Sequence, residues 1–356
     1  MKMVTDPYIP ARHWTGKRPP RRILAIRLQA MGDMIITLPY LQALKNSLPA
    51  DTELHLLTRD EVDPVPRGIQ LFDKIFSIGG GRNFKKQVLY AAALMPQLLW
   101  QRYDMVLDLQ NNPISRYVRR LINPIAWSQF DKTSPRAAGE RTRLTIEACM
   151  QQQLQPDYDF QLKEALPVHE LLFSNGWNGE ELVLLNPAAA FPTRNWPLFN
   201  YVRFAELWLE QRPDTSFLIL GTSFISEKAN ELKAALGNKL IDLTEKTTPL
   251  MAFAVLQEVQ FMLTEDSGLM HMAWVSGVPL LALFGGTRSD WSRPLGDHTS
   301  LLDSSDLSCG NCMLAECPYG DVHCLTRYSP EQVVERSLQL LQRVSSSPWL
   351  YHPSNE

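Results

Sequence analysis

The sequence has no run of about 18 apolar residues, the length that a membrane-spanning helix needs. The stretch from Val88 to Trp100 is broken by Pro96 and Gln97, and the N-terminal residues lack the apolar core of a signal peptide. The arginines are not interleaved with an aromatic stacking motif of a recognisable type, and the net charge is only −3. We therefore expect a globular cytoplasmic protein with no nucleic acid as partner.

Charge is divided unevenly along the chain. Residues 1–180 contain 23 Lys and Arg against 18 Asp and Glu, whereas the remaining residues contain 12 against 20. The pattern predicts either a surface for an anionic acceptor or an anionic membrane face, or else an ordinary solvated helix face. The basic side chains that concentrate in the first half are Arg116, Arg119, Arg120, Arg136, Arg141 and Arg143.

A chain of 356 residues with 45% hydrophobic content can bury a large core, and its length favours two domains. Apolar strand-like runs alternate with helical periodicity, which predicts an α/β protein with two facing Rossmann-like domains and parallel sheets. The polar stretch from Gln151 to Pro167 is the best boundary. We expect an irregular N-terminal arm (1–20), an N-terminal domain (21–165), a C-terminal domain (166–330) and a last helix (331–345). Helices are predicted over 34–46, 86–102, 115–122, 199–210, 226–236, 250–257 and 269–275.

The segment from Asp266 to Ala273 follows an apolar run and predicts a strand, a glycine-containing turn and the start of a helix. Gly268 lets the backbone approach a ligand closely, and the first-turn N–H groups with the positive end of the helix dipole favour a phosphate there. The alternative is an Asp or Ser cap followed by a core helix.

Three motifs occur in order: Met31-Gly32-Asp33, the segment 266–273, and Phe284-Gly285-Gly286-Thr287. Together they resemble the heptosyltransferase family of glycosyltransferases, glycosyltransferase family 9, over most of the chain. The resemblance implies the GT-B fold, with a donor-binding C-terminal domain and an acceptor-binding N-terminal domain that close to exclude water.

The resemblance also implies a reaction. It is the inverting, metal-independent transfer of a heptose or related sugar from an ADP-sugar to an anionic saccharide or glycolipid acceptor of lipopolysaccharide or a related glycan. No cofactor is required for such transfer, and the protein would contact the inner face of the cytoplasmic membrane peripherally. Two other classes stay open: a sugar-nucleotide epimerase of similar architecture and a non-catalytic sugar-nucleotide-binding protein.

Asp33 follows Gly32 in the loop after the first predicted strand, which places its carboxylate at the edge where open α/β sheets bind ligands. The resemblance assigns it the role of general base toward the acceptor hydroxyl. The alternative is that Asp33 caps a helix that begins at Met34, where the helix dipole would favour the charged carboxylate and weaken the base.

Arg194 comes soon after the predicted strand that ends at Asn186, so its guanidinium can reach a donor diphosphate. The family often has lysine here, which changes the hydrogen-bond geometry, and an exposed arginine at a helix start is the alternative. We assign catalysis to Asp33 and Arg194.

Further donor contacts are predicted around this group. Asp266 resembles a residue near the donor sugar or a helix cap, while Ser267, Gly268 and His271 would supply donors to the phosphates. His271 could equally be a hydrogen-bonded packing residue, and Glu227 a solvated surface acid. The remaining predicted donor-binding residues are Leu269, Thr287, Thr193 and Thr244.

Four of the five cysteines are clustered as Cys309, Cys312, Cys317 and Cys324. In a reducing compartment such a cluster favours a structural zinc or iron site, with packing thiols and disulfides as alternatives. The pair of carboxylates in Asp157-Tyr158-Asp159 falls in the predicted linker, and chance explains it better than a metal site.

Overall fold

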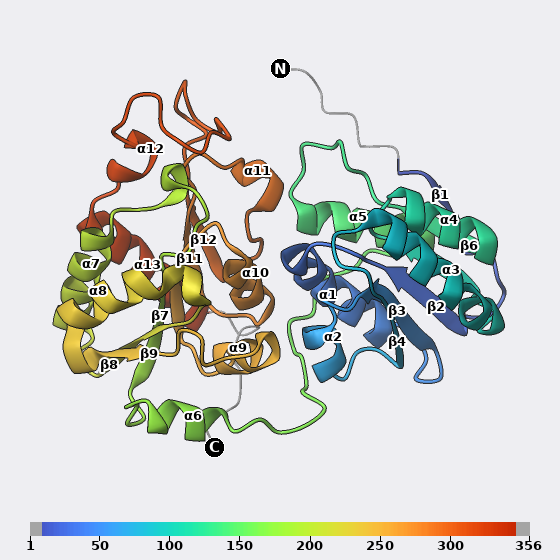
Figure 1. The fold of residues 1–356 in the computed structure, drawn as a ribbon, viewed down its shortest axis with the longest axis horizontal. Helices are drawn as coiled ribbons and strands as arrows, with labels where there is room; N and C mark the ends of the chain where they lie inside the picture. The colour runs from blue at the N-terminus through green and yellow to red at the C-terminus, as the bar shows by residue number, and fades with distance from the viewer. Residues whose placement is uncertain (1–8, 347–356) are drawn as a thin grey trace. The chain divides into compact units, whose positions relative to one another are not determined.

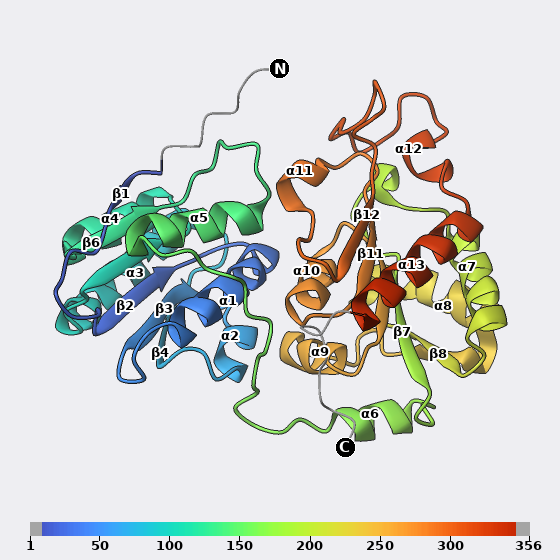
Figure 2. The same ribbon diagram turned by 180° about the vertical axis from the view of Figure 1, so that it is seen from behind.

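The computed structural model describes residues 9–346, and the chain divides into two compact units, residues 1–164 and residues 165–356. Each unit contains a six-stranded sheet with helices on its faces, as Figures 1 and 2 show from opposite sides. Below, these are called the first unit and the second unit. Among the described residues, no helix combines the length and the apolar character needed to cross a membrane.

The first unit is built on a sheet with the strand order β1-β6-β5-β2-β3-β4. All neighbouring strands are parallel except β1, which pairs antiparallel with β6. The strands are β1 (Ala11–Arg12), β2 (Arg22–Ile26), β3 (Glu53–Arg59), β4 (Lys74–Ile78), β5 (Met105–Asp108) and β6 (Ala126–Gln129). The helices are α1 (Met31–Asn46), α2 (Pro64–Gly68), α3 (Phe84–Trp100), α4 (Pro113–Ile122) and α5 (Ala138–Met150).

Two expectations for the first unit were wrong. The N-terminal arm is not wholly irregular, because Ala11 and Arg12 form β1; its residues 1–8 lie outside the described part. The helix expected to begin at Met34 begins at Met31, with Ala30 as its N-cap, because the side chain of Asp33 rather than that of a cap residue binds the free backbone N–H.

One face of the first sheet packs against α3 and α4. Leu24 and Ile26 of β2 join Met95 and Leu98 of α3 and Val118 of α4 in a buried cluster. Alternate residues of a strand point to opposite faces, so the neighbours of Leu24 and Ile26 along β2 face the other side of the sheet. Those neighbours, Ile23 and Ala25, are also fully buried, so the sheet is covered on both faces, as parallel sheets usually are.

The second unit is built on a wholly parallel sheet with the strand order β12-β11-β10-β7-β8-β9. The strands are β7 (Glu181–Asn186), β8 (Thr215–Ile219), β9 (Leu240–Asp242), β10 (Phe261–Glu265), β11 (Leu280–Leu283) and β12 (Thr299–Leu302). The longer helices are α6 (Val168–Ser174), α7 (Leu198–Gln211), α8 (Ser226–Leu236), α9 (Pro249–Leu256), α10 (Gly268–Val275) and α13 (Pro330–Ser345). Shorter ones are η1 (Pro192–Arg194), η2 (Ser223–Ile225), η3 (Gly237–Lys239), α11 (Ser289–Ser292) and α12 (His323–Thr326). The predicted α/β class with two parallel sheets is confirmed.

Aromatic packing anchors the second core. The ring of Trp208 on α7 stacks on Phe261 of β10 at a centroid distance of 5.1 Å, and both side chains are fully buried. The last helix, α13, begins with a capping box at Ser329 and Gln332 and packs on α7, β11 and β12. This packing places α13 against both α7 and the sheet.

Candidate functional site

The start of α10 forms the predicted turn at the carboxyl end of β10. Ser267 is the N-cap, and its hydroxyl oxygen accepts the backbone N–H of Met270 at 3.4 Å. The Asn186 amide donates to Ser267 Oγ and to Thr264 Oγ1, both at 2.7 Å, so β7 orients the cap. The expected cap is therefore Ser267, followed by a largely buried helix, and the capping alternative for Asp266 is wrong.

Gly268 is the first residue of α10 and is exposed. A Cβ atom built there would meet no atom of the described residues within 4 Å, apart from its chain neighbours and the backbone of its own helix. Packing within the protein therefore does not require glycine at this position. An open space in front of free helix N–H groups is what close approach of a phosphate requires.

Arg194 ends the short helix η1 and lies beside this turn. Its Nη1 is 3.6 Å from Asp266 Oδ2, and its guanidinium carbon lies 4.9 Å from the centre of the Phe191 ring. The arginine side chain is 19% exposed and the aspartate side chain 10%, so the pair is largely shielded from solvent. The structure thus brings together three predicted residues, Arg194, Asp266 and Ser267.

A buried acid that the sequence reasoning missed holds the η1 segment. Glu265, the last residue of β10, is fully buried and accepts the backbone N–H of Ala189 at 3.0 Å and of Trp196 at 2.7 Å. Lys228 of α8, also missed, donates to Pro187 O and to Asn195 Oδ1, both at 2.6 Å. The available signal was a charged residue at the end of an otherwise apolar strand, since buried acids are almost always paired.

Glu265 predicts a specific pH dependence of stability. Burial raises the pKa of its carboxyl to about 7, against the opposing effects of Lys228 and the two backbone bonds. Because the folded state holds this proton more tightly than the unfolded state, the free energy of unfolding should fall as pH rises from about 4.5 to about 7, by about 3 kcal/mol from this group. Melting temperatures across this range should show a weaker pH dependence in Glu265→Gln than in the wild type.

The control for this measurement is Glu227→Gln, which removes an exposed carboxylate from the same unit. It should keep the pH dependence of the wild type. If the melting temperatures of Glu265→Gln and the wild type changed equally with pH between 4.5 and 8, the assignment to Glu265 would be contradicted.

The η1 turn is fastened to the loop that follows β11. The backbone oxygen of Thr193 accepts the N–H of Gly286 at 2.8 Å, and the Thr193 hydroxyl donates to Leu314 O at 2.5 Å. A Cβ atom at Gly285 would lie 2.1 Å from Thr193 O, which is far inside van der Waals contact. Glycine at 285 is therefore required by packing, and the Thr193 hydroxyl is engaged within the protein.

The other predicted donor residues differ in accessibility. Thr287 is buried, and its Oγ1 has no hydrogen-bond partner among the described residues. Thr244 Oγ1 is likewise buried and has no such partner within residues 9–346. His271 is buried with its ring 6.4 Å from that of Trp274, and Glu227 is exposed at the start of α8. Leu269 is half-buried in the first turn of α10.

Asp33 lies in the first turn of α1 in the first unit. One carboxylate oxygen accepts the N–H of Ala30 at 3.0 Å, and the other is 2.8 Å from Nη2 of the buried Arg27. The side chain remains 42% exposed, so a hydroxyl group can reach it. The alternative that Asp33 caps a helix beginning at Met34 is wrong, because α1 begins at Met31 with Ala30 as its N-cap and Asp33 binds the backbone from within the first turn. The role of general base stays a prediction.

Two further residues that were missed position Asp33. Gln110 accepts the backbone N–H groups of Leu28 at 2.8 Å and of Gln29 at 3.0 Å, which orders the loop before α1. The guanidinium of Arg27 pairs with one carboxylate oxygen of Asp33 and fixes its position. Neither belongs to a motif, so their contacts were visible only in the fold.

The basic residues of the first unit divide into paired and exposed groups. Arg136 pairs with Glu140, Arg143 pairs with Glu147 at 2.7 Å, and Arg119 lies 3.7 Å from the buried Asp108. Arg116 and Arg120 are exposed on α4. Much of the basic run thus serves local ion pairs, and a smaller part forms a surface.

The four clustered cysteines lie in the loop between β12 and α12 and on α12 itself. All four are free thiols, so the alternative of disulfide bonds among them is wrong. The described residues include no group of three or more His, Cys, Asp or Glu side chains that could hold a metal ion, so the thiols as placed do not form the tetrahedral site. Burial, with smaller effects of the other three thiols, raises the pKa of Cys324 to about 11. The loop contacts the segment that follows β11, since the Met313 N–H donates to Gly286 O at 2.7 Å.

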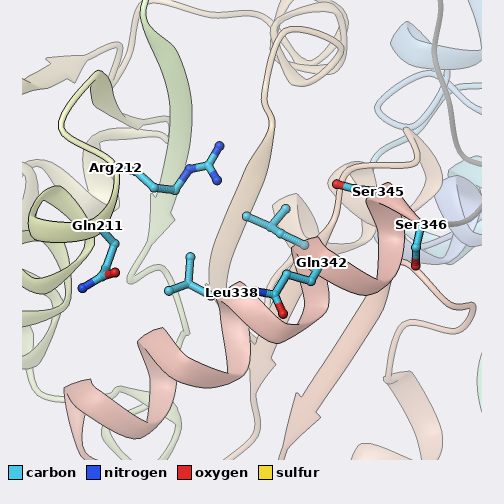
Figure 3. A pocket seen from close by; sticks show the side chains of 7 residues that line it. Gln211, Arg212, Leu338, Gln342, Ser345 and Ser346 are labelled. Atoms are coloured by element: carbon cyan, nitrogen blue, oxygen red, sulfur yellow. The ribbon is translucent and has the colours of Figure 1, made fainter.

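An open hollow of about 550 Å³ lies elsewhere in the second unit, between the ends of α7 and α13 (Figure 3). Leu338 and Leu341 provide apolar lining, and Gln342 and Arg212 lie at its sides. The Arg212 guanidinium is already paired with Glu181 at 2.7 and 2.8 Å. None of the predicted site residues lines this hollow, so we do not assign it to the same chemistry.

Two successive α/β units with parallel sheets, the second with an open helix start at the carboxyl edge of its sheet, define a protein of the two-domain class that includes the GT-B glycosyltransferases. Residues 136–323 match the model of glycosyltransferase family 9 (heptosyltransferase). The chain belongs to this family.

Among curated relatives, lipooligosaccharide heptosyltransferase 2 of Campylobacter jejuni is 30% identical over 46% of this chain and 52% of that protein. The chain thus spans about half the length of that relative. Lipopolysaccharide heptosyltransferase 1 of Pseudomonas aeruginosa is 24% identical over 88% of this chain and 96% of that protein.

Solved structures show the same fold. A glycosyltransferase of family 9 from Veillonella parvula superimposes with a TM-score of 0.76 at 19% identity, covering 90% of this chain and 97% of that one. The ADP-heptose lipopolysaccharide heptosyltransferase II of E. coli gives a TM-score of 0.68 at 18% identity, covering 91% and 100%.

Proposed function

We propose that the protein is an inverting glycosyltransferase that moves a heptose or related sugar from an ADP-sugar to a saccharide acceptor of lipopolysaccharide or a related glycan. Support comes from family membership and from relatives that are named as lipopolysaccharide and lipooligosaccharide heptosyltransferases. The observation that carries the proposal is the open start of α10, where Gly268 faces free space and Arg194 lies beside the turn.

The second unit would bind the donor. The donor diphosphate would accept hydrogen bonds from the first backbone N–H groups of α10 and from the Arg194 guanidinium. The diphosphate would thereby replace part of the contact between Arg194 and Asp266. Thr287 and Thr244, whose buried hydroxyls have no partner among the described residues, are suited to further polar contacts with the nucleotide. These groups would stabilise the negative charge that develops on the departing ADP.

The first unit would supply the base. In transfer, a bond forms between the acceptor oxygen and the anomeric carbon, while the bond from that carbon to the ADP oxygen breaks. Asp33 would take the proton of the acceptor hydroxyl as it attacks. Attack on the face opposite the leaving group inverts the anomeric configuration. Arg27 and the Ala30 N–H hold the carboxylate in place without covering it.

Transfer by this route needs no metal ion, because protein groups bearing positive charge meet the diphosphate. A chelator should therefore leave the transfer rate unchanged. Zinc or iron on the four cysteines stays a prediction for a structural role only, and metal analysis of the purified protein measures it.

The decisive experiment supplies ADP-heptose with and without a lipopolysaccharide-core acceptor. Transfer predicts ADP release that depends on the acceptor, together with a product of inverted anomeric configuration. A change in the donor sugar without acceptor would indicate an epimerase, and tight donor binding without turnover a binding protein. A thermal-shift comparison of ADP-, GDP- and UDP-sugars would identify the nucleotide, because selective binding raises the melting temperature.

Arg194→Ala should weaken binding of the ADP-sugar roughly 10- to 100-fold and also lower the rate, because its partner is charged both before and during transfer. Arg194→Lys should retain part of the affinity, since lysine keeps the charge but loses the bidentate geometry. Calorimetric titration with ADP, together with steady-state kinetics, measures both effects.

The control is Arg203→Ala, which removes a half-exposed arginine of the same unit that pairs with Glu206. Its ADP affinity should match the wild type. An Arg194→Ala variant with normal ADP affinity and a defect toward the acceptor alone would remove Arg194 from the donor site.

The acceptor would be an anionic saccharide or glycolipid, and the protein would act in the cytoplasm at the inner face of the cytoplasmic membrane. The absence of a nucleic acid partner stays a prediction. The exposed Arg116 and Arg120 support an anionic partner for the first unit.

A further inference from the structure

Helix α3 of the first unit is apolar on the side that faces solvent as well as on the side that faces the core. Gln87, Ala91, Met95 and Leu98 point into the protein. A surface helix normally carries polar residues on its opposite side. Here the outermost positions, at intervals of four, three and four residues, form an exposed apolar line that we call the outer stripe: Leu89, Ala93, Pro96 and Trp100.

The outer stripe is strongly exposed. Leu89 is 70% and Trp100 82% accessible, although each would gain free energy by leaving water. More apolar side chains stand exposed on either side of the stripe along the same helix: Phe84, Val88, Tyr90 and Leu99. Single exposed apolar residues are ordinary, but a continuous apolar face on one helix marks an interaction surface.

Helix α4 lies beside α3 and adds positive charge (Figure 1). Arg116 and Arg120 are one helical turn apart on its exposed side, and Lys85 and Lys86 are exposed in the first turn of α3. Neither helix contains an Asp or Glu. Arg119 does not contribute, because it is buried against Asp108 and the Trp127 ring.

We propose that this α3–α4 face binds the surface of a bilayer that contains anionic lipids. The outer stripe would enter the boundary between headgroups and acyl chains, and the four cations would contact lipid phosphates. The exposed aromatic residues Trp100 and Tyr117 suit the interfacial layer, where apolar rings with a polar group are favoured. A second copy related by a two-fold axis fits less well, because it would place these cations against their own equivalents.

The position of this face connects it with the acceptor. Helices α3 and α4 each begin at the carboxyl edge of the first sheet, after β4 and β5, and Asp33 follows β2 at the same edge. A lipid-anchored acceptor held at the bilayer surface would therefore be presented near the edge that carries Asp33. This connection rests on the proposed function, whereas binding to the bilayer does not.

The test is co-sedimentation of the full-length protein with vesicles of phosphatidylethanolamine and phosphatidylglycerol, compared with vesicles of phosphatidylcholine. Binding should require the anionic lipid and weaken with salt. The double variant Leu89→Gln with Trp100→Gln should lower the partition coefficient at least about tenfold. The double variant Lys85→Gln with Lys86→Gln should lower it roughly tenfold to thirtyfold.

Matched controls change exposed residues elsewhere. Lys132→Gln with Lys163→Gln removes two exposed cations of the first unit, and Phe199→Gln removes an apolar side chain that is 72% exposed in the second unit. Both should bind vesicles as the wild type does. The substituted side chains are exposed, so thermal melting should be unchanged in every variant.

Three results would overturn the proposal. They are no vesicle binding by the wild type at low salt, unchanged binding by both double variants, or a concentration-dependent dimer that the Leu89→Gln with Trp100→Gln variant abolishes. Titration with ADP, run on the same samples, distinguishes failure of the membrane-binding proposal from failure of the proposed function. Loss of vesicle binding with normal ADP affinity concerns the α3–α4 face alone, and absent ADP binding in the wild type concerns the donor site alone.

Discussion

Replacing Asp33 with alanine should lower turnover roughly 10²- to 10⁴-fold, which is the usual effect of losing a general base. The affinity for the ADP-sugar should stay nearly unchanged, because the donor contacts proposed above lie in the second unit and Asp33 lies in the first. The carboxylate is half-exposed and is held by Arg27 and the Ala30 N–H, which is consistent with the proposed role of base. Steady-state kinetics with saturating donor and acceptor measure the turnover, and ADP titration measures the affinity.

A second role of Asp33 must be separated from this effect. Because its carboxylate also binds the start of α1 and pairs with the buried Arg27, Asp33→Ala should lose more stability than the roughly 1 kcal/mol of a lost helix cap. Asp33→Asn keeps an oxygen for the Ala30 N–H and should be as inactive as the alanine variant but more stable.

The matched control is Asp157→Asn, which changes a carboxylate of the same unit that binds Asn46 at 2.7 Å. Its turnover should equal that of the wild type. Wild-type turnover in Asp33→Asn would remove Asp33 from the mechanism.

Two glycines of the second unit should respond to the same substitution in opposite ways. Gly285→Ala should destabilise the protein by about 3 kcal/mol, the upper end of the usual range for overpacking, because the new methyl group would meet the backbone oxygen of Thr193. This backbone atom cannot move away without shifting η1. Thermal melting should show a clear fall in the midpoint, and ADP affinity should fall with it.

Gly268→Ala should leave the melting temperature unchanged, since no atom of the described residues lies within 4 Å of the new methyl group, apart from its chain neighbours and the backbone of its own helix. The same methyl group would occupy the space that we assign to the diphosphate, so ADP binding should weaken at least about tenfold. Unaltered ADP affinity in a stable Gly268→Ala variant would contradict the assignment of the phosphate to the start of α10.

The overall architecture could be predicted because apolar runs such as Phe261–Glu265 alternate with helical periodicity. The start of α10 was predictable for a related reason, since Ser267 closely follows a buried strand and precedes an apolar segment, and serine is a preferred helix N-cap. The beginning of α1 was misplaced because Ala30 is an atypical N-cap and the stabilising side chain lies three residues later.

The support of the site was much harder to predict. Glu265 and Lys228 are 37 positions apart in sequence, and only the fold brings both of them to the segment that carries Arg194. Gln110 and Arg27 act on the Asp33 loop in the same indirect way. Local sequence patterns report periodicity and turn chemistry, whereas contacts between distant polar residues depend on how strands are ordered in the sheet.

The hydrogen bonds that join Thr193, Gly286 and residues Met313 and Leu314 make three distant segments mechanically interdependent. If the segment around Thr193, which we assign to donor binding, were replaced by that of a homologue, the loop that contains the clustered cysteines would have to be replaced with it. A chimera that exchanges only one of these segments would lose the hydrogen bonds to the other two. Substrate preference is therefore best re-engineered by exchanging all three segments together.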